Sequence, residues 1–287
     1  MIKKYHIGTT QWGVKDWVGH FYTDHAKPDN FLQQYASVFN SVEGNTTFYR
    51  VPSLETVKRW GADVPEGFKF CFKFPQSITH YKSLLNVTDE VNRFLDLFTP
   101  IRKHLGPFHI QLSSRFSPNE FQKIEQLVED LPAHFAYAVE VRHPDFFDKG
   151  INERRFCELL TSFNIDKVLF DTRRLHSLKS VDASVVEAKK KKPNLPARFD
   201  TTGSRPFLRY VGANDVLKNE THLKEWAIIV ADWIREGKHP YVFIHAPDTF
   251  YAPGLIVYFH SELMKFIDLE ELPVWPYKRK DRQLGLF

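Results

Sequence analysis

The sequence predicts an α/β fold: a single (β/α)8 barrel of the TIM type with a long insertion between its sixth and seventh strands. Eight short β-rich runs recur, and they start about 27 to 40 residues apart, the length of one strand, one helix and their loops. Segments with helical periodicity separate these runs. The first run is not followed by the glycine-rich phosphate loop that the rival fold, an open doubly wound sheet, would carry there.

The expected strands are short runs rich in β-branched and aromatic residues. They are Tyr5–Thr10, Ser41–Phe48, Phe68–Pro75, Phe108–Ser114, Ala136–His143, Lys167–Arg173, Pro206–Gly212 and Tyr241–Pro247. Between them apolar residues recur at helical spacing, as in Phe121, Ile124 and Val128. Strands that alternate with helices indicate a parallel sheet, and eight such strands close a barrel. We expect the barrel to cover residues 1–272 and a basic tail to follow over 273–287.

One stretch, from about 174 to 205, breaks this alternation. It is polar, it contains the four consecutive lysines 189–192, and it shows only a brief helical pattern near Val181–Val186. We expect an extended connection between the sixth and seventh strands. A charge run of this kind is typical of a solvated segment rather than of a nucleic-acid contact.

Composition limits the function classes. The formal charge of +4 and the pI near 8.8 permit contact with anions without requiring a nucleic-acid partner. The two cysteines, Cys71 and Cys157, form neither a disulfide framework nor a metal-ligand spacing. No secretory signal follows Met1, and no apolar run reaches the ~18 residues of a membrane span. We therefore expect a cytoplasmic protein with no membrane contact.

Charged and polar side chains recur near the ends of the expected strands, on the faces that alternation turns inward. They are Glu43 and Asn45 on the second strand, Lys73 on the third, Glu140 and Arg142 on the fifth, Asp171 on the sixth and Arg209 on the seventh. Buried charges are costly unless they are paired, and polar residues at the carboxyl ends of barrel strands usually belong to an active site. We expect a site here, an internal salt-bridge network, or both.

The residue types leave several chemistries open. Arg142, Arg209 and Lys73 suit a phosphate or a carboxylate. Glu43 and Glu140 could be the acid and base of a glycoside hydrolase. The two glutamates with Asp171 and His245 could hold a divalent ion, but three nearby cations disfavour a metal, so the cofactor is left unknown.

Loop residues near these strand ends add further candidates for the site. His80 and His143 follow the third and fifth strands and could be acid–base catalysts or hydrogen-bonded surface residues. Trp12 and Tyr22 could line the mouth of the site and stack on a base or sugar, or could simply pack. The catalytic candidates are thus Glu43, Glu140, Asp171 and His143. The binding candidates are Asn45, Lys73, His80, Arg142, Arg209, Trp12 and Tyr22.

Several motifs together resemble the YecE-like family of uncharacterised barrel proteins. They are Gly8-Thr9 with Trp12, Val42–Tyr49 (VEGNTTFY), Phe72–Pro75 (FKFP), Ala138–Pro144 (AVEVRHP) and Leu208–Gly212 (LRYVG). The resemblance covers nearly the whole chain. It implies a (β/α)8 barrel whose pocket is lined by the seven strand-end residues from Glu43 to Arg209 named above. It implies no known activity. Many relatives carry an Asn-Asn pair after the eighth strand, where this chain has His245-Ala246-Pro247-Asp248.

The last five residues, Gln283, Leu284, Gly285, Leu286 and Phe287, resemble the short peptide with which bacterial proteins dock onto the DNA polymerase sliding clamp. Leu284, Leu286 and Phe287 would carry the apolar contacts, and Gln283 would supply hydrogen bonds. The alternative is that this tail packs against the barrel.

The first hypothesis from these observations is an enzyme, a hydrolase or a lyase, that acts on a phosphorylated or nucleic-acid-related substrate. The clamp peptide would recruit it to DNA, as in DNA repair. Two alternatives remain open: a non-catalytic adaptor that binds a small anionic ligand, and a carbohydrate-active hydrolase using Glu43 and Glu140. The sequence does not decide whether the chain is catalytic.

Overall fold

Parallel strands, each followed by one or more helices, make up the computed structural model, which describes residues 4–283. Each strand lies within one of the expected runs, except that the sixth starts one residue earlier, and each is shorter than its run. Asn45, Lys73 and Arg142, which were expected on strands, follow the strand ends, and Thr46–Tyr49 is helical. The strands are β1 (His6–Gly8), β2 (Ser41–Gly44), β3 (Lys69–Phe72), β4 (Phe108–Gln111), β5 (Tyr137–Glu140), β6 (Asp166–Asp171), β7 (Phe207–Val211) and β8 (Tyr241–His245).

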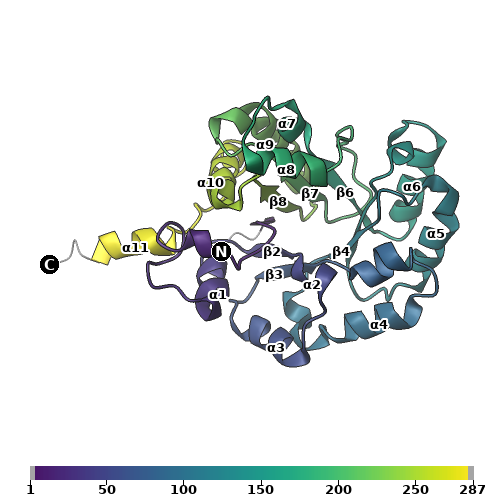
Figure 1. Cartoon of the computed structure of the whole chain (residues 1–287), viewed down its shortest axis with the longest axis horizontal. Helices are drawn as coiled ribbons and strands as arrows, with labels where there is room; N and C mark the ends of the chain where they lie inside the picture. Colours follow the sequence, from purple (N-terminus) through teal and green to yellow (C-terminus); the bar gives the residue numbers. More distant parts are fainter. Residues whose placement is uncertain (1–3, 284–287) are drawn as a thin grey trace.

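The helices lie around the outside of the strands (Figure 1). They are α1 (Phe31–Ala36), α2 (Thr46–Tyr49), α3 (Leu54–Ala62), α4 (Thr88–Asp96), α5 (Phe121–Asp130), α6 (Ile151–Ser162), α7 (Arg173–Ser177), α8 (Ala183–Lys191), α9 (Glu220–Arg235), α10 (Ala252–Leu263) and α11 (Pro276–Gln283). In α9, Leu223, Trp226 and Val230 share one face and are buried, as helical periodicity requires. Across residues 4–283, no helix combines the length and the hydropathy that a bilayer crossing needs.

The strands form two separate parallel sheets, so the prediction of one closed eight-stranded barrel is wrong. Six strands make an open half-barrel in the order β1-β8-β7-β6-β5-β4, and β2 pairs only with β3. At the seam between β3 and β4 the ladder is reduced to isolated bridges, Phe70 with Leu105 and Lys73 with His109. The hydrogen-bonded ladder is therefore interrupted on both sides of the β2–β3 pair.

Side chains explain the interruption between β1 and β2. The backbone N–H of Ile7 donates to Asn40 Oδ1 (2.8 Å), and the N–H of Thr9 donates to the Tyr35 hydroxyl (2.7 Å). The same hydroxyl donates to the backbone oxygen of Ser41 at 2.9 Å. Backbone N–H and C=O groups that would pair the two strands are thus bound by side chains. A backbone hydrogen bond from Glu43 N to Thr9 O, at 3.0 Å, still joins this seam.

The core has an outer and an inner layer. The phenylalanines of β3 face the helices, where Phe72 stacks on Trp60 of α3 and on Phe98. The opposite face of the strands contributes a smaller buried cluster inside the sheets. It consists of Cys71, Ala138, Val168, Phe207, Tyr241 and Phe243. The polar residues described below lie farther along the same inner face, toward the carboxyl ends of the strands.

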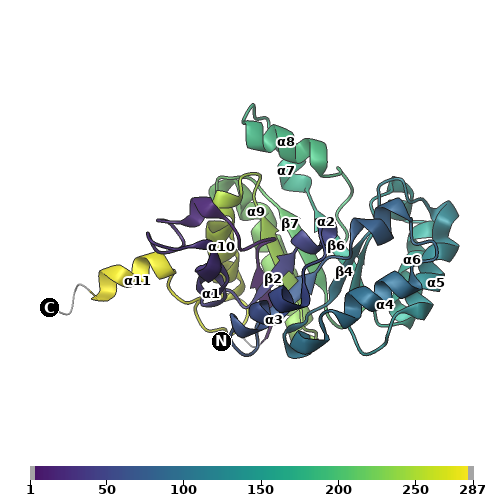
Figure 2. The same cartoon turned by 60° about the horizontal axis from the view of Figure 1, so that its bottom comes forward.

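The polar segment between β6 and β7 folds into α7 and α8, which lie beyond the carboxyl ends of these strands (Figure 2). A small core of Leu175, Val185, Ala188 and Val211 attaches the two helices to β7. The four lysines 189–192 were predicted to be solvated, but they are not all exposed. Lys191 is exposed and pairs with Glu187, whereas Lys192 is partly buried and faces the site.

Candidate functional site

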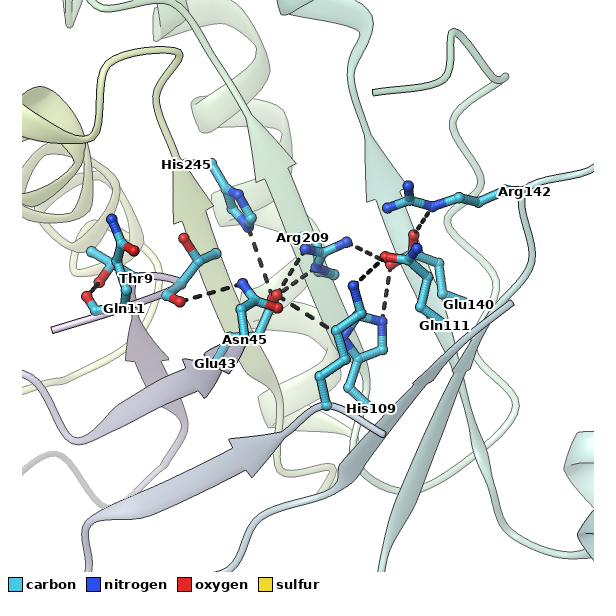
Figure 3. Close-up of polar contacts among 12 residues, drawn as sticks. Thr9, Gln11, Glu43, Asn45, His109, Gln111, Glu140, Arg142, Arg209 and His245 are labelled. Atoms are coloured by element: carbon cyan, nitrogen blue, oxygen red, sulfur yellow. Dashed lines mark hydrogen bonds and ion pairs between the residues drawn. The ribbon is translucent and has the colours of Figure 1, made fainter. Parts of the chain in front are cut away.

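A polar cluster occupies the inner face of the strands and connects the two sheets (Figure 3). Glu43 comes from β2, His109 from β4, Glu140 is the last residue of β5, and Arg209 lies in the middle of β7. All four are buried. The parallel order of the strands places side chains that are far apart in sequence at the same end of the sheet.

Arg209 holds both glutamates of this cluster. Its Nε and Nη2 donate to the two oxygens of Glu43, each at 2.7 Å, and its Nη1 donates to Glu140 Oε2 at 2.6 Å. The bidentate pair with Glu43 joins β7 to β2 across the open side of the half-barrel. A side-chain ion pair between the inner faces thus connects the two sheets, whose backbone ladders are separate.

Both carboxylates are ionised. Burial alone would raise the pKa of Glu43, but the Arg209 guanidinium outweighs it and holds that pKa well below its usual value. The same balance holds the pKa of Glu140 well below normal, because Arg142 and Arg209 outweigh its burial. Neither carboxyl can therefore keep a proton near neutral pH, as a general acid must.

Two neutral histidines adjoin the carboxylates. His109 Nε2 donates to Glu140 Oε2 at 3.0 Å, and burial lowers the pKa of His109. Burial lowers the pKa of His245 to about 4, with its Nε2 3.8 Å from Glu43 Oε2. Within residues 4–283, His109 Nδ1 and His245 Nε2 are buried without a hydrogen-bond partner. Such orphaned nitrogens on an inner face are groups that a ligand or water can satisfy.

Arg142 presents a free edge at the partly exposed side of the cluster. Its Nε donates to Glu140 Oε1 at 2.6 Å, and its guanidinium lies over the Phe170 ring at 5.3 Å. Neither Nη atom has a hydrogen bond to another described residue, and the side chain is 16% exposed. The other end of this guanidinium is therefore oriented by Glu140 and Phe170 but available to an incoming anion.

Lys73 lies nearby, where β3 ends. Its Nζ donates to Gln111 Oε1 at 2.7 Å and lies 4.0 Å from the centre of the Phe48 ring. Burial, reinforced by Arg209, lowers the pKa of Lys73 to about 7. This amine is thus poised to gain or lose a proton near neutral pH.

Lys192 reaches the cluster from the segment after α8. His176 Nε2 lies 3.1 Å from the Lys192 carbonyl oxygen, and Thr172, just after β6, donates to the oxygen of Pro193 at 2.9 Å. These contacts hold the lysine over the strand ends. Burial, with Arg209 and Arg142 next in effect, lowers the pKa of Lys192 to about 8. Its ammonium group has no hydrogen-bond or ion-pair partner in the described part of the chain.

The charge balance of the cluster differs from the expectation. Three acids against three cations were predicted, but two carboxylates lie here with Arg142, Arg209, Lys73 and Lys192. Two of the cations, Arg209 and the Nε side of Arg142, already neutralise the glutamates. The positive excess comes from the two lysines and favours an anionic ligand.

Two predicted catalytic residues lie outside this cluster. Asp171 points to the other face of β6, where it accepts bonds from Trp226 Nε1 (2.7 Å) and Arg173 Nη2 (2.8 Å). The inner face of β6 carries Phe170 instead, so the strand alternates in the opposite phase. His143 caps the short helix Pro144–Phe147 by accepting from the N–H of Asp145, and its ring forms no hydrogen bond or ion pair with the described residues of the cluster.

The remaining candidates divide between packing and lining roles. Tyr22 is fully buried and donates to the backbone oxygen of Trp12 at 2.6 Å, so it belongs to the core. His80 is half-buried beside Phe48, and burial, with Lys73, lowers its pKa to about 4. Asn45 donates to the oxygen of Thr10 at 3.3 Å, while its Oδ1 is buried without a partner among the described residues. Trp12 lines a cavity beyond Asn45.

The sequence reasoning missed Lys192, Phe170 and Phe48. Strand alternation from the buried Val168 signals Phe170, and Phe48 lies in the quoted VEGNTTFY motif. No sequence signal separates Lys192 from its three lysine neighbours. Of the proposed clamp peptide, Gln283 ends α11, and Leu284, Leu286 and Phe287 lie outside the described residues.

The cluster geometry bears on the two other chemistries left open. Among the side chains of residues 4–279, no group of three or more His, Cys, Asp or Glu is arranged to hold a metal ion. Asp171 lies apart from the glutamates that would have shared such a site. A glycoside hydrolase needs one carboxyl as an acid, but Arg209 keeps both Glu43 and Glu140 ionised.

Comparison with known proteins gives one consistent result. The family model "Protein of unknown function DUF72" matches residues 6–276. The chain is 34% identical over 272 residues to the UPF0759 protein YecE of Escherichia coli K12, covering 94% of this chain and 97% of that protein. These matches confirm the YecE-like resemblance.

Solved structures agree with this assignment. A DUF72 family protein from Thermotoga maritima MSB8 has a TM-score of 0.70 and 26% identity, with 90% of this chain and 98% of that one covered. A DUF72 family protein from Enterococcus faecalis V583 has a TM-score of 0.66 over 93% of this chain and 98% of that one. At 17% identity this second match shows the fold alone.

Proposed function

The chain belongs to DUF72, a protein family of unknown function, and we propose that its polar cluster binds the phosphoryl or carboxylate group of an anionic substrate. The observation that carries the proposal is the free edge of Arg142, fixed by Glu140 and Phe170 and flanked by two lysines. A planar guanidinium held in this way favours oxyanions, which can accept two of its N–H bonds at once.

The glutamates act as a rigid support in this proposal. Arg209 satisfies Glu43 and one oxygen of Glu140, and the remaining oxygen of Glu140 orients Arg142. Binding then requires little rearrangement, because the receptor groups are already held in place before the ligand arrives. The buried glutamates also keep the surrounding cations from repelling one another.

We further propose that the bound substrate undergoes acid–base chemistry of the lyase or hydrolase type, with Lys73 as the proton-transferring group. Its pKa of about 7 suits a catalyst at neutral pH, where both the acid and the base form are populated. Gln111 fixes the Nζ position, and the nearby cations would stabilise negative charge that develops on the substrate.

The experiment that tests anion binding is a calorimetric titration with inorganic phosphate. Arg142→Gln should weaken phosphate binding about tenfold to a hundredfold, the range expected for the loss of charge-assisted hydrogen bonds. Arg154→Gln is the matched control, because Arg154 is exposed on α6 and is not among the residues of the polar cluster. Near-ultraviolet circular dichroism checks that each variant is folded. No phosphate binding by the parent protein, or equal binding by Arg142→Gln, would overturn the proposal.

Docking onto the sliding clamp stays a separate proposal, supported by the direction of α11. This helix runs outward from the body in both views, so the described part of the tail leads away from the strands (Figures 1 and 2). Purified clamp should retain the full chain in a pull-down and lose it when residues 283–287 are deleted. Unchanged retention after the deletion would rule out this route.

A further inference from the structure

A cavity lies beside the polar cluster, between the loop after β1, α2 and α3. Its volume is about 820 Å³, which is within the range of cavities that hold small-molecule ligands. The residues that matter for its chemistry are Trp12, Asn45, Tyr49, Arg50, Arg59 and Trp60. The acid–base proposal above uses none of them.

The charged residues that line this cavity are all positive. Arg50 and Arg59 both line it and are exposed, and no aspartate or glutamate is among the lining residues. In the described chain, neither guanidinium forms a hydrogen bond or an ion pair. Two guanidinium groups on one hollow, neither with an ion-pair partner among the described residues, favour a ligand with more than one negative charge.

Aromatic rings line the same cavity. Tyr49 is 75% exposed at its rim, although a tyrosine of that size gains stability from burial. Trp12 and Trp60 are half-buried and pack edge to face, with their ring centres 5.4 Å apart. Exposed aromatic rings beside arginines form stacking platforms for flat ring systems, and every nucleobase offers such a face.

Asn45 connects the cavity to the polar cluster. It lines the cavity, follows Glu43 by two residues, and lies next to the Glu43–Arg209 pair in Figure 3. Its unpartnered, buried Oδ1 can accept a hydrogen bond from an amino or imino group of a ligand. Asn45 is therefore the residue through which a molecule bound in the cavity would adjoin the polar cluster.

We propose that this cavity binds a short stretch of single-stranded nucleic acid, with bases against Tyr49 and the Trp12–Trp60 pair and backbone phosphates on Arg50 and Arg59. This rests on the proposed function, because it identifies the substrate of the polar cluster as a nucleic-acid strand. The arginines neutralise the backbone without reading its sequence, and the rings accept any base.

Fluorescence anisotropy with a fluorescein-labelled oligodeoxythymidylate tests this proposal on the full chain. Tyr49→Ala should weaken binding at least about fivefold, and Tyr49→Phe, which keeps the ring, should bind like the parent. Arg59→Gln should weaken binding and lower the slope of log affinity against log salt concentration by about 0.7, the value for one phosphate contact on a single strand. Arg154→Gln serves again as the control.

Inorganic polyphosphate of matched charge separates base stacking from simple charge attraction. The proposal requires that polyphosphate competes poorly with the oligonucleotide, because it has no bases. Equal competition, or parent-like oligonucleotide binding by both Tyr49→Ala and Arg59→Gln, would overturn it. The same two variants should bind inorganic phosphate normally at the polar cluster. Failure of the cavity is thereby distinguished from failure of the cluster itself.

Discussion

Arg209→Met tests how far the polar cluster supports the fold. Methionine replaces the aliphatic stem of the arginine and carries no charge, so the change removes three hydrogen bonds while keeping the apolar part of the side chain. Removal of one member of a buried ion pair typically costs about 3–5 kcal/mol of unfolding free energy. We expect a loss in this range at pH 7.

Most of this loss of unfolding free energy should come from Glu43 rather than from Glu140. Glu140 keeps Arg142 at 2.6 Å and His109 at 3.0 Å after the substitution. Glu43 keeps only more distant neighbours, His109 Nδ1 at 4.0 Å and His245 Nε2 at 3.8 Å. Both rings are neutral in the parent protein, so Glu43 becomes a buried carboxylate without a compensating charge.

The loss of unfolding free energy in Arg209→Met should also depend on pH. In the parent, the pKa of Glu43 in the folded state is depressed, so its stabilising effect persists above the unfolded-state pKa and is lost only in strong acid. Without Arg209, burial raises that folded-state pKa above the unfolded value. The folded variant then retains a proton that the unfolded chain releases, and its penalty grows by about 1.4 kcal/mol per pH unit up to the new pKa. The penalty should therefore be larger at pH 7 than at pH 5.

Urea unfolding, followed by tryptophan fluorescence at both pH values, measures this penalty. The double variant Arg209→Met/Glu43→Gln should be more stable than Arg209→Met at pH 7, because the uncompensated charge is gone. Arg154→Met controls for loss of an exposed arginine. A penalty below about 1 kcal/mol, or one that is the same at pH 5 and pH 7, would refute the reasoning.

Three further predictions concern the seam between the sheets and the lysine over the site. Tyr35→Phe should cost about 2–4 kcal/mol in urea unfolding, because it leaves the buried N–H of Thr9 and the oxygen of Ser41 unpaired; a cost under 1 kcal/mol would contradict this. Gly8→Ala should lower the melting temperature sharply or prevent folding, since the new Cβ would lie 1.9 Å from the Ser41 backbone oxygen; an unchanged melting temperature would contradict it. Sulfate affinity, measured by calorimetry, should fall from pH 7 to pH 9 as Lys192 loses its proton near pH 8, and Lys192→Met should reduce that fall; an equal fall in both proteins would exclude this role.

The strands were predictable because their signal is local. Short β-branched and aromatic runs at the spacing of a βα unit identified all of β1 to β8. Closure of the barrel was not predictable in the same way, because it depends on which groups the backbone of β1 meets. Asn40 and Tyr35 bind those groups, and nothing in the sequence spacing marks either residue as a partner of β1.

The residues of the candidate site were likewise predictable where the sequence signal is local and not where it depends on the folded chain. Glu43, Lys73, Glu140 and Arg209 were predicted together, because alternation within clearly bounded strands turns them inward. Asp171 was misplaced because the polar end of β6 was taken to set the inward phase, whereas Phe170 takes that position. Lys192 comes from a segment with no strand or strong helix pattern, so only the folded chain shows where its side chain lies.

The central claim is that Arg142, Lys73 and Lys192 together bind an oxyanion. A crystal structure of the protein soaked with tungstate tests it most directly, because the heavy atom locates a phosphate-like oxyanion unambiguously. We expect tungstate within hydrogen-bonding distance of the free Nη atoms of Arg142 and near the Lys192 ammonium group. Tungstate bound only elsewhere, such as on the exposed Lys191 or on Arg50 and Arg59, would contradict it.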